Sequence, residues 1–239
     1  KNIEIIISDD GSTDKTPEIL LDYANKYPKL IKLVLNKVNS GVAFNFNQAY
    51  LIATGEYLAT LSGDDLMYPD KLKKQVDLME HNDNCVVCHH DAIVFDSTTK
   101  EKKGLFSQIY GPGKNIKAKG DFKLKFDPGA RMLPSTFMYR KIACPATGHD
   151  ERLGVMAEMA FDVEVALKGN ICYIDEALGA YRRHDKNITN ILATNISMGL
   201  ENEMLALALL GTRYPNLHSI VRKTRKFFLL KAAAKALKL

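Results

Sequence analysis

Residues 3–14 of the chain read IEIIISDDGSTD, a short apolar run that ends abruptly in a polar turn. Residues 3–8 are rich in β-branched isoleucine, which favours a strand. The polar residues 9–14 follow at once and predict a turn at the carboxyl end of that strand. Thr16 and Pro17 then form the pattern of a helix start, an N-cap residue before a proline in the first helical position. The stretch therefore predicts a strand–turn–helix unit.

The same alternation continues through the first hundred residues. Further strands are predicted at residues 30–35, 56–61 and 85–95, and helices at residues 16–27, 43–53 and 69–81. Strands that alternate with helices of this length are normally joined by right-handed crossovers, which produce a mainly parallel sheet with both faces covered. The sequence therefore predicts an α/β fold.

The alternation ends after Asp96. Residues 100–131 are rich in Lys and Gly and predict an inserted loop or hairpin. Beyond them we expect a strand at residues 132–139, a helix at 154–167, a short strand at 171–174, a loop from Ala180 onwards, and from about residue 188 helices alone, interrupted at Gly211 and Pro215. We therefore expect one domain over residues 1–187 and a helical extension over residues 188–239.

Composition and charge exclude several classes of protein. An apolar content of 46% argues against disorder, and no apolar run approaches the length of a membrane span. Four cysteines are too few for a disulfide scaffold and fit the reducing cytoplasm, where we expect the protein to reside. The net charge is +5, but residues 222–239 carry seven basic residues and no acid, which leaves −2 for the rest. A slightly acidic body argues against a nucleic-acid partner.

The basic segment 222–239 also contains large apolar residues, among them Phe227, Phe228, Leu229, Leu230 and Leu237. On a helix this mixture makes a cationic amphipathic surface suited to anionic lipid headgroups. The alternative is a helix that packs on the domain or on a second copy of the chain. The segment thus predicts either peripheral contact with the inner face of the membrane or self-association.

Two acidic pairs, Asp9-Asp10 and Asp64-Asp65, follow predicted parallel strands. In open α/β sheets this carboxyl edge is where ligands bind. Carboxylates gathered there repel one another unless a cation or a hydrogen-bond donor joins them. Mg²⁺ or Mn²⁺ holding a diphosphate is the simplest arrangement, because such ions bind one or two carboxylates plus phosphate oxygens. The alternative is that these aspartates only form turns and helix caps.

The motifs together resemble a known family. They are IIISDDGSTD at residues 5–14, NSGVA at 39–43 with Asn47, ATGEY at 53–57, LSGDD at 61–65 followed by Pro69, DERL at 150–153 and YRRH at 181–184. In order and spacing they resemble the inverting glycosyltransferases of family 2, whose nucleotide-sugar-binding fold is called GT-A. The resemblance implies a Rossmann-like fold with a nucleotide-sugar-binding half over residues 1–98 and an acceptor and catalytic half over residues 99–187.

The resemblance implies a donor site in the first half. Asp9 would accept a hydrogen bond from the N3–H of uracil or thymine, and Asp10 would support that loop. Asn39, Gly41 and Asn47 would line the nucleoside. Members of the family begin with a further strand and helix, so we expect the natural chain to extend before its first residue.

The resemblance also implies a divalent metal, Mn²⁺ or Mg²⁺. Asp64 and Asp65 stand at the family's acidic motif, and Asp64 would thereby contact the donor as well. Many members have Asp where this chain has Ser62, so one carboxylate is absent. His184 stands where a histidine supplies a further ligand in some relatives, the alternative being an ordinary exposed loop histidine.

Inversion at the anomeric carbon requires a base that takes the proton of the acceptor hydroxyl. The family places a Glu-Asp pair at the start of a helix, with the Asp as the base. Here the pair falls on Ala157 and Glu158, so the resemblance makes Glu158 the base and Asp162, one turn on, the second candidate. The alternative is that Glu158 is only a helix-start acid favoured by the helix dipole.

These implications describe an inverting glycosyltransferase that moves a sugar from a UDP- or dTDP-sugar to a hydroxyl of a glycan or lipid-linked saccharide in surface polysaccharide synthesis. The alternative is a non-catalytic relative that binds sugar nucleotides, because Ser62 and Ala157 replace acids of the family pattern.

Overall fold

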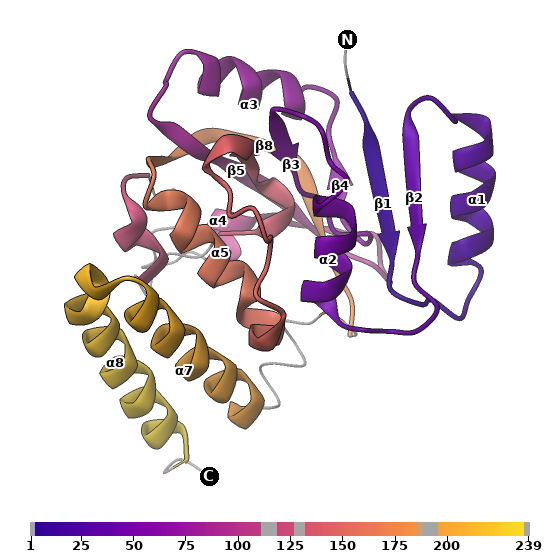
Figure 1. The fold of residues 1–239 in the computed structure, drawn as a ribbon. Helices are drawn as coiled ribbons and strands as arrows, with labels where there is room; N and C mark the ends of the chain where they lie inside the picture. Colours follow the sequence, from indigo (N-terminus) through magenta and orange to yellow (C-terminus); the bar gives the residue numbers. More distant parts are fainter. Residues whose placement is uncertain (1–2, 111–118, 127–131, 186, 188–195, 237–239) are drawn as a thin grey trace.

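The computed structural model describes residues 3–110, 119–126, 132–185, 187 and 196–236. Figure 1 shows helices packed around sheets, with a pair of long helices at the C-terminal end. The helices are α1 (Thr16–Lys26), α2 (Val42–Tyr50), α3 (Lys71–Glu80), α4 (Phe106–Tyr110), α5 (Ala157–Ala166), α7 (Ile196–Arg213) and α8 (His218–Ala236). The strands are β1 (Ile5–Asp9), β2 (Ile31–Leu35), β3 (Tyr57–Ala59), β4 (Leu66–Met67), β5 (Cys85–Asp96), β6 (Lys102–Leu105), β7 (Met138–Arg140) and β8 (Asn170–Arg183).

The described strands form two sheets. β1 and β2 pair in parallel, and the other six strands form a sheet of order β3-β7-β5-β8-β4, with β6 added at β5. The long β5/β8 pair is parallel, whereas β3/β7, β4/β8, β5/β6 and β5/β7 are antiparallel. The predicted α/β fold is confirmed, with a mixed sheet; β6, for example, follows β5 through a short turn and pairs antiparallel with it. Only a crossover connection imposes parallel order.

A carboxylate links the two sheets. Glu4 accepts hydrogen bonds from the Thr54 backbone N–H at 2.6 Å and hydroxyl at 2.9 Å, and from the Gly55 N–H at 3.1 Å. Lys32 of β2 pairs with the same carboxylate at 2.6 Å. These bonds lower the pKa of Glu4 to about 2, and the contact with Lys32 is the largest cause of that shift. Glu4 therefore fixes the start of β1 against the turn that leads into β3.

The second half of the chain departs from the sequence expectation in its strands. β8 extends through Arg182 and Arg183, which pair with Phe95 and Asp96 of β5, so the loop predicted from Ala180 is wrong. The hairpin expected after Asp96 is confirmed, because β6 pairs antiparallel with β5. Residues 111–118 and 127–131 of that segment lie outside the described residues. Of the strand expected at 132–139, only the last residues pair, and Pro134–Thr136 forms a 3-10 helix.

The described C-terminal residues, 196–236, are mainly helical, as predicted, and one expected break is wrong; residues 188–195 and 237–239 of the predicted extension lie outside the described residues. α7 continues through Gly211 to Arg213, and the chain then turns at a short 3-10 helix, Pro215–Leu217. A single glycine costs a helix only about 1 kcal/mol. Packing of the buried Leu207 and Leu210 outweighs that cost. In the part of the chain that is described, no helix combines the length and apolar character needed to cross a bilayer.

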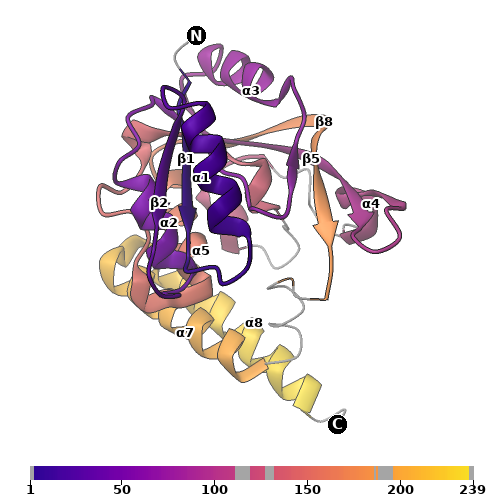
Figure 2. The same cartoon turned by 90° about the vertical axis from the view of Figure 1, so that its right-hand side faces the viewer.

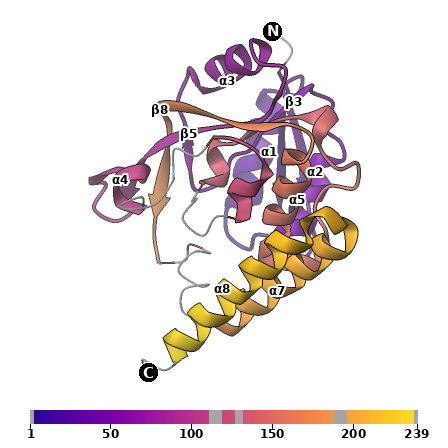
Figure 3. The same ribbon diagram turned by 90° about the vertical axis from the view of Figure 1, so that its left-hand side faces the viewer.

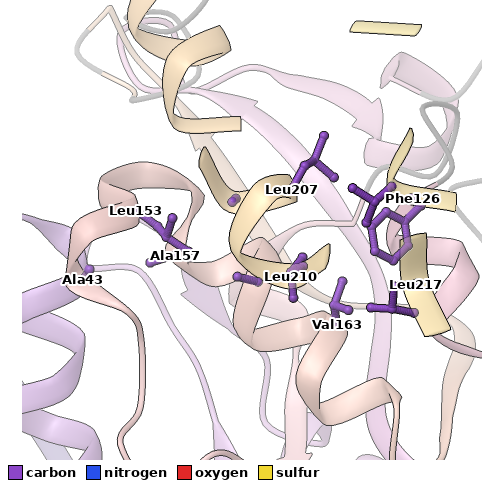
Figure 4. Packing of buried hydrophobic residues seen from close by; sticks show 11 residues of the cluster. Ala43, Phe126, Leu153, Ala157, Val163, Leu207, Leu210 and Leu217 are labelled. Carbon is purple, nitrogen blue, oxygen red and sulfur yellow. The ribbon is translucent and has the colours of Figure 1, made fainter. Parts of the chain in front are cut away.

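α5 lies at the centre of the largest hydrophobic cluster. Figure 4 shows Leu153, Ala157 and Val163, from α5 and the segment before it, facing Leu207 and Leu210 of α7. Figures 2 and 3 show α7 and α8 side by side at the end of the molecule toward which β8 points. The C-terminal helices therefore share one core with the helix that carries the predicted base.

Candidate active site

The turn after β1 binds its own backbone and the loop before α2. Asp9 is buried, and its carboxylate accepts from the Ser12 N–H at 2.9 Å and hydroxyl at 2.5 Å. Asp10 accepts from the N–H groups of Ser40 and Gly41, both at 2.9 Å. The two predicted donor-site aspartates thus hold together the turn and the loop on which the predicted nucleoside-binding residues stand.

Gly11 allows these two segments to touch. Its φ of +74° is a conformation that only glycine adopts readily. A Cβ atom at this position would lie 2.7 Å from the carbonyl carbon of Val38 and 2.8 Å from the nitrogen of Asn39. The predicted nucleoside residues Asn39 and Gly41 are therefore set against the β1 turn by direct backbone contact.

Two asparagines of α2 anchor it on opposite sides. Asn45, which was not among the predicted residues, accepts from the Ser8 hydroxyl at 2.6 Å and the Asn36 amide at 3.0 Å. Asn47 accepts from the His149 N–H at 2.7 Å and donates to the His149 carbonyl at 3.0 Å and to Glu151 at 2.9 Å. The amide of Asn47, predicted to line the nucleoside, is thus engaged with the segment before α5.

Asp64 and His184 meet although 120 residues separate them. The Nε2 atom of His184 lies 2.9 Å from Oδ2 of Asp64, and both side chains are part-exposed, at 29% and 37%. Asn187 braces the pair. Its amide nitrogen lies 3.1 Å from the same Asp64 oxygen, and its amide oxygen accepts from the His184 N–H at 2.7 Å. A lone asparagine in a polar loop carries no sequence signal, so Asn187 was not among the predicted residues.

Asp65 faces the opposite way from Asp64. It is only 7% exposed and accepts from the Ser135 hydroxyl at 2.5 Å and the Arg182 N–H at 2.9 Å. Burial raises the pKa of Asp65, and these hydrogen bonds oppose the shift. The acidic pair thus divides into one outward side chain and one inward side chain.

The donor atoms fit a hard divalent cation in part. Among the described residues, no three His, Cys, Asp or Glu side chains are placed to hold a metal ion together. Asp64 and His184 supply one oxygen and one nitrogen at adjacent positions. Mg²⁺ and related ions commonly take one or two protein ligands and complete their shell with phosphate oxygens and water. The pair is therefore suited to a cation that arrives with a diphosphate.

Glu158 and Asp162 lie one turn apart on α5 in different surroundings. Asp162 is buried, pairs with Lys125 at 2.5 Å and accepts from the Tyr139 hydroxyl at 2.7 Å. Burial, then the charge of Asp162, raises the pKa of Glu158 to about 8, and Lys125 opposes the shift. Both oxygens of Asp162 are engaged, so Glu158 is the carboxylate better placed to exchange a proton.

Comparison with known proteins identifies the family of the chain. The sequence profile of Glycosyl transferase family 2 matches residues 1–143. EpsE of Bacillus subtilis, named as a glycosyltransferase, is 39% identical over 120 residues, which are 50% of this chain and 42% of that protein. An uncharacterized protein of Mycobacterium tuberculosis is 40% identical over 103 residues, 42% of this chain and 30% of that protein. The chain therefore spans less than half the length of these relatives.

Solved structures share the fold at low sequence identity. TarS of S. aureus in complex with UDP aligns with a TM-score of 0.61 at 20% identity, over 87% of this chain and 56% of that one. The mannosyltransferase PcManGT from Pyrobaculum calidifontis, in complex with GDP-Man and Mn²⁺, aligns with a TM-score of 0.58 at 16% identity, over 97% and 66%. The likeness shows a GT-A architecture. With the profile match over more than half of its length, the chain belongs to glycosyl transferase family 2.

Proposed function

We propose that this protein transfers a sugar, with inversion, from a UDP- or dTDP-sugar to a hydroxyl of a glycan or lipid-linked saccharide in surface polysaccharide synthesis. The observation that carries the proposal is the meeting of Asp64 with His184 beside the end of β8. That TarS is seen with UDP and UDP-GlcNAc, and PcManGT with GDP-Man, supports the nucleotide-sugar class.

In this proposal the turn after β1 receives the nucleoside. Each oxygen of a carboxylate can accept more than one hydrogen bond, so Asp9 can hold Ser12 and still accept from a base N3–H. Asp10 keeps the loop of Asn39 and Gly41 in place. Asn47 acts on the nucleoside indirectly, because its amide binds His149 and so fixes the position of α2.

Asp64 and His184 would hold Mn²⁺ or Mg²⁺, and Asp65 would orient the segment that carries Asp64. Such an ion, when bound, supplies positive charge to the departing diphosphate. The Mn²⁺ in PcManGT supports the choice of ion.

Glu158 is the proposed general base. A base is most effective when its pKa is near the working pH, and burial raises the pKa of Glu158 to about 8. The Lys125–Asp162 pair at 2.5 Å lies beside it, and Asp162 raises the proton affinity of Glu158 through its charge. Asp162 remains the second candidate for the base. Before it could act, its two oxygens would have to be released from Lys125 and Tyr139.

A non-catalytic sugar-nucleotide-binding protein is the second candidate function, favoured by Ser62 and Ala157 in place of acids. Release of UDP or dTDP from a panel of sugar nucleotides, with and without Mn²⁺ and with glycan acceptors, separates the two. The Glu158→Gln variant should lose about 10²- to 10⁴-fold in kcat, the usual contribution of a positioned base, and keep donor binding. Glu18→Gln, also in the first turn of a helix but exposed, is the matched control. Donor binding without turnover for every acceptor would favour the second candidate.

We further propose that α8 faces an anionic membrane surface. Among its described side chains, five basic ones are exposed, those of Arg222, Lys223, Arg225, Lys226 and Lys231. Phe227, Leu229 and Leu230 are exposed among them, at 43%, 51% and 61%. Two such cationic faces would repel each other, so charge favours lipid over self-association. α8 lies at the end of the molecule toward which β8 points, where a lipid-linked acceptor would approach.

A further inference from the structure

Lys71 is a lysine with no exposed surface, at the first residue of α3. Its ammonium donates to the Ser135 carbonyl at 2.7 Å and to the Thr60 carbonyl at 3.1 Å. In the described part of the chain no carboxylate forms an ion pair with it. Its hydrogen bonds go only to carbonyl groups, and the nearby charge of Asp65 offsets part of the cost of burial. A buried charge without an ion-pair partner is expensive, and an apolar side chain of the same length would fill the space at less cost. Packing alone therefore does not account for Lys71.

The two carbonyls stand where the chain leaves the sheet for the acidic pair. Thr60 directly follows β3 and lies two residues before Ser62, and its hydroxyl donates to the Pro134 carbonyl at 2.6 Å. Ser135 lies in the 3-10 helix that precedes β7, the partner of β3. Lys71 thus binds the backbone of Thr60 and the backbone of Ser135, close to where the segment 62–65 begins.

Ser135 transmits this contact to the acidic pair. Its hydroxyl donates to Asp65 at 2.5 Å and accepts from the Ser62 N–H at 3.0 Å. Asp65 in turn accepts from the Arg182 N–H at 2.9 Å, two residues before His184. A continuous series of hydrogen bonds therefore runs from Lys71 to the backbone beside each member of the Asp64–His184 pair.

Gln75, one turn further along α3, provides an internal comparison. It is equally buried and donates to the Thr136 carbonyl at 2.8 Å and the Cys88 carbonyl at 3.1 Å. Lys71 and Gln75 thus bind consecutive carbonyls of the same short segment. Of the two contacted residues, Ser135 is the one whose side chain binds Asp65; the Thr136 hydroxyl donates instead to the Leu133 carbonyl at 2.6 Å.

We propose that Lys71 is a positioning residue for the cation-holding pair: its ammonium fixes Ser135, and Ser135 fixes Asp65 and the segments that present Asp64 and His184. This inference rests on the cation site of the proposed function. Side chains that orient metal ligands without touching the metal typically change metal affinity by about 10- to 100-fold when they are replaced.

The test observes Mn²⁺ alone, by the paramagnetic broadening of the His184 ring signals in NMR spectra, assigned with a His184→Gln variant. Lys71→Met and Ser135→Ala should each need at least about tenfold more Mn²⁺ than the wild type for equal broadening. Gln75→Met should lose stability but keep the wild-type Mn²⁺ dependence. Ser135→Thr, which keeps a hydroxyl, should show the wild-type Mn²⁺ dependence that Ser135→Ala loses. Ser135→Ala carries the test if Lys71→Met does not fold.

Wild-type Mn²⁺ dependence in folded Lys71→Met, or in Ser135→Ala, overturns the positioning role and leaves the proposed function standing. An equal loss of Mn²⁺ response in Gln75→Met overturns it as well, because general loosening of α3 would then explain the effect. Absence of any His184 broadening in the wild type removes the cation site itself, and the inference falls with it.

Discussion

At the scale of single residues, neighbouring acids have separate tasks. Asp64 faces outward and Asp65 inward, and Asp162 is engaged by Lys125 and Tyr139 while Glu158 has a raised pKa. The sequence could identify these acidic positions, Asp64 and Asp65 from the predicted strand that they follow, and Glu158 and Asp162 from the family resemblance. It could not distinguish their roles, since orientation depends on donors such as Ser135 that are distant in the sequence.

The raised pKa of Glu158 predicts a pH dependence. A base must be unprotonated to act, so the group is inactive below its pKa, and kcat should rise with pH through about 8. An ordinary glutamate, with a pKa near 4.5, would give no change in this range. The measurement is kcat at saturating donor and acceptor from pH 6 to 9, with Glu18→Gln as the control. A flat profile would remove Glu158 from the role of base.

At the scale of elements, asparagine side chains decide where α2 lies. Asn45 binds the ends of β1 and β2, and Asn47 binds the segment before α5. The sequence predicted α2 and the strands around it from residue composition and from the loops that bound them, but such local signals do not report which polar groups a helix meets. The antiparallel pairing of β4 and β7 was missed for a related reason, since strand patterns carry no information about the partner strand.

Replacing Asn47 should therefore affect stability. Asn47→Ala leaves the buried N–H and carbonyl of His149 without partners, and each unsatisfied group costs about 1–3 kcal/mol. The free energy of unfolding from urea denaturation measures the loss. Asn39→Ala, at an exposed position, should stay within about 0.5 kcal/mol of the wild type. Equal stability of the two variants would contradict the anchoring role.

At the scale of the whole molecule, α8 is a helix on which exposed basic side chains and exposed apolar side chains are interspersed. Lys223, Lys226 and Leu230 lie on the side opposite to the buried Val221 and Thr224. The sequence predicted a cationic amphipathic helix, and the described residues show which of its side chains the core leaves exposed. It could not choose a partner for that surface, because composition fits lipid and protein alike.

The proposed membrane contact is tested with vesicles. The protein should co-sediment with vesicles that contain phosphatidylglycerol and not with pure phosphatidylcholine, and salt should weaken binding. Replacing Lys223 and Lys226 together by Glu should reduce binding by more than about tenfold, since each basic residue near an anionic surface contributes about 1 kcal/mol. The control is Lys73→Glu on α3, also exposed. Unchanged vesicle binding in the double variant, or a protein that dimerises through α8 instead, would refute the proposal.

The packing of α7 on α5 has a practical consequence for anyone who expresses fragments of this chain. Arg213 pairs with Glu164 of α5 and with Asp150, at 3.2 Å from the latter. Cutting after residue 187, where the sequence motifs end, would uncover the apolar side of α5 and leave Glu164 without its counter-charge. A truncated product of that kind should collect in inclusion bodies, so the helical extension has to be kept with residues 1–187 during purification.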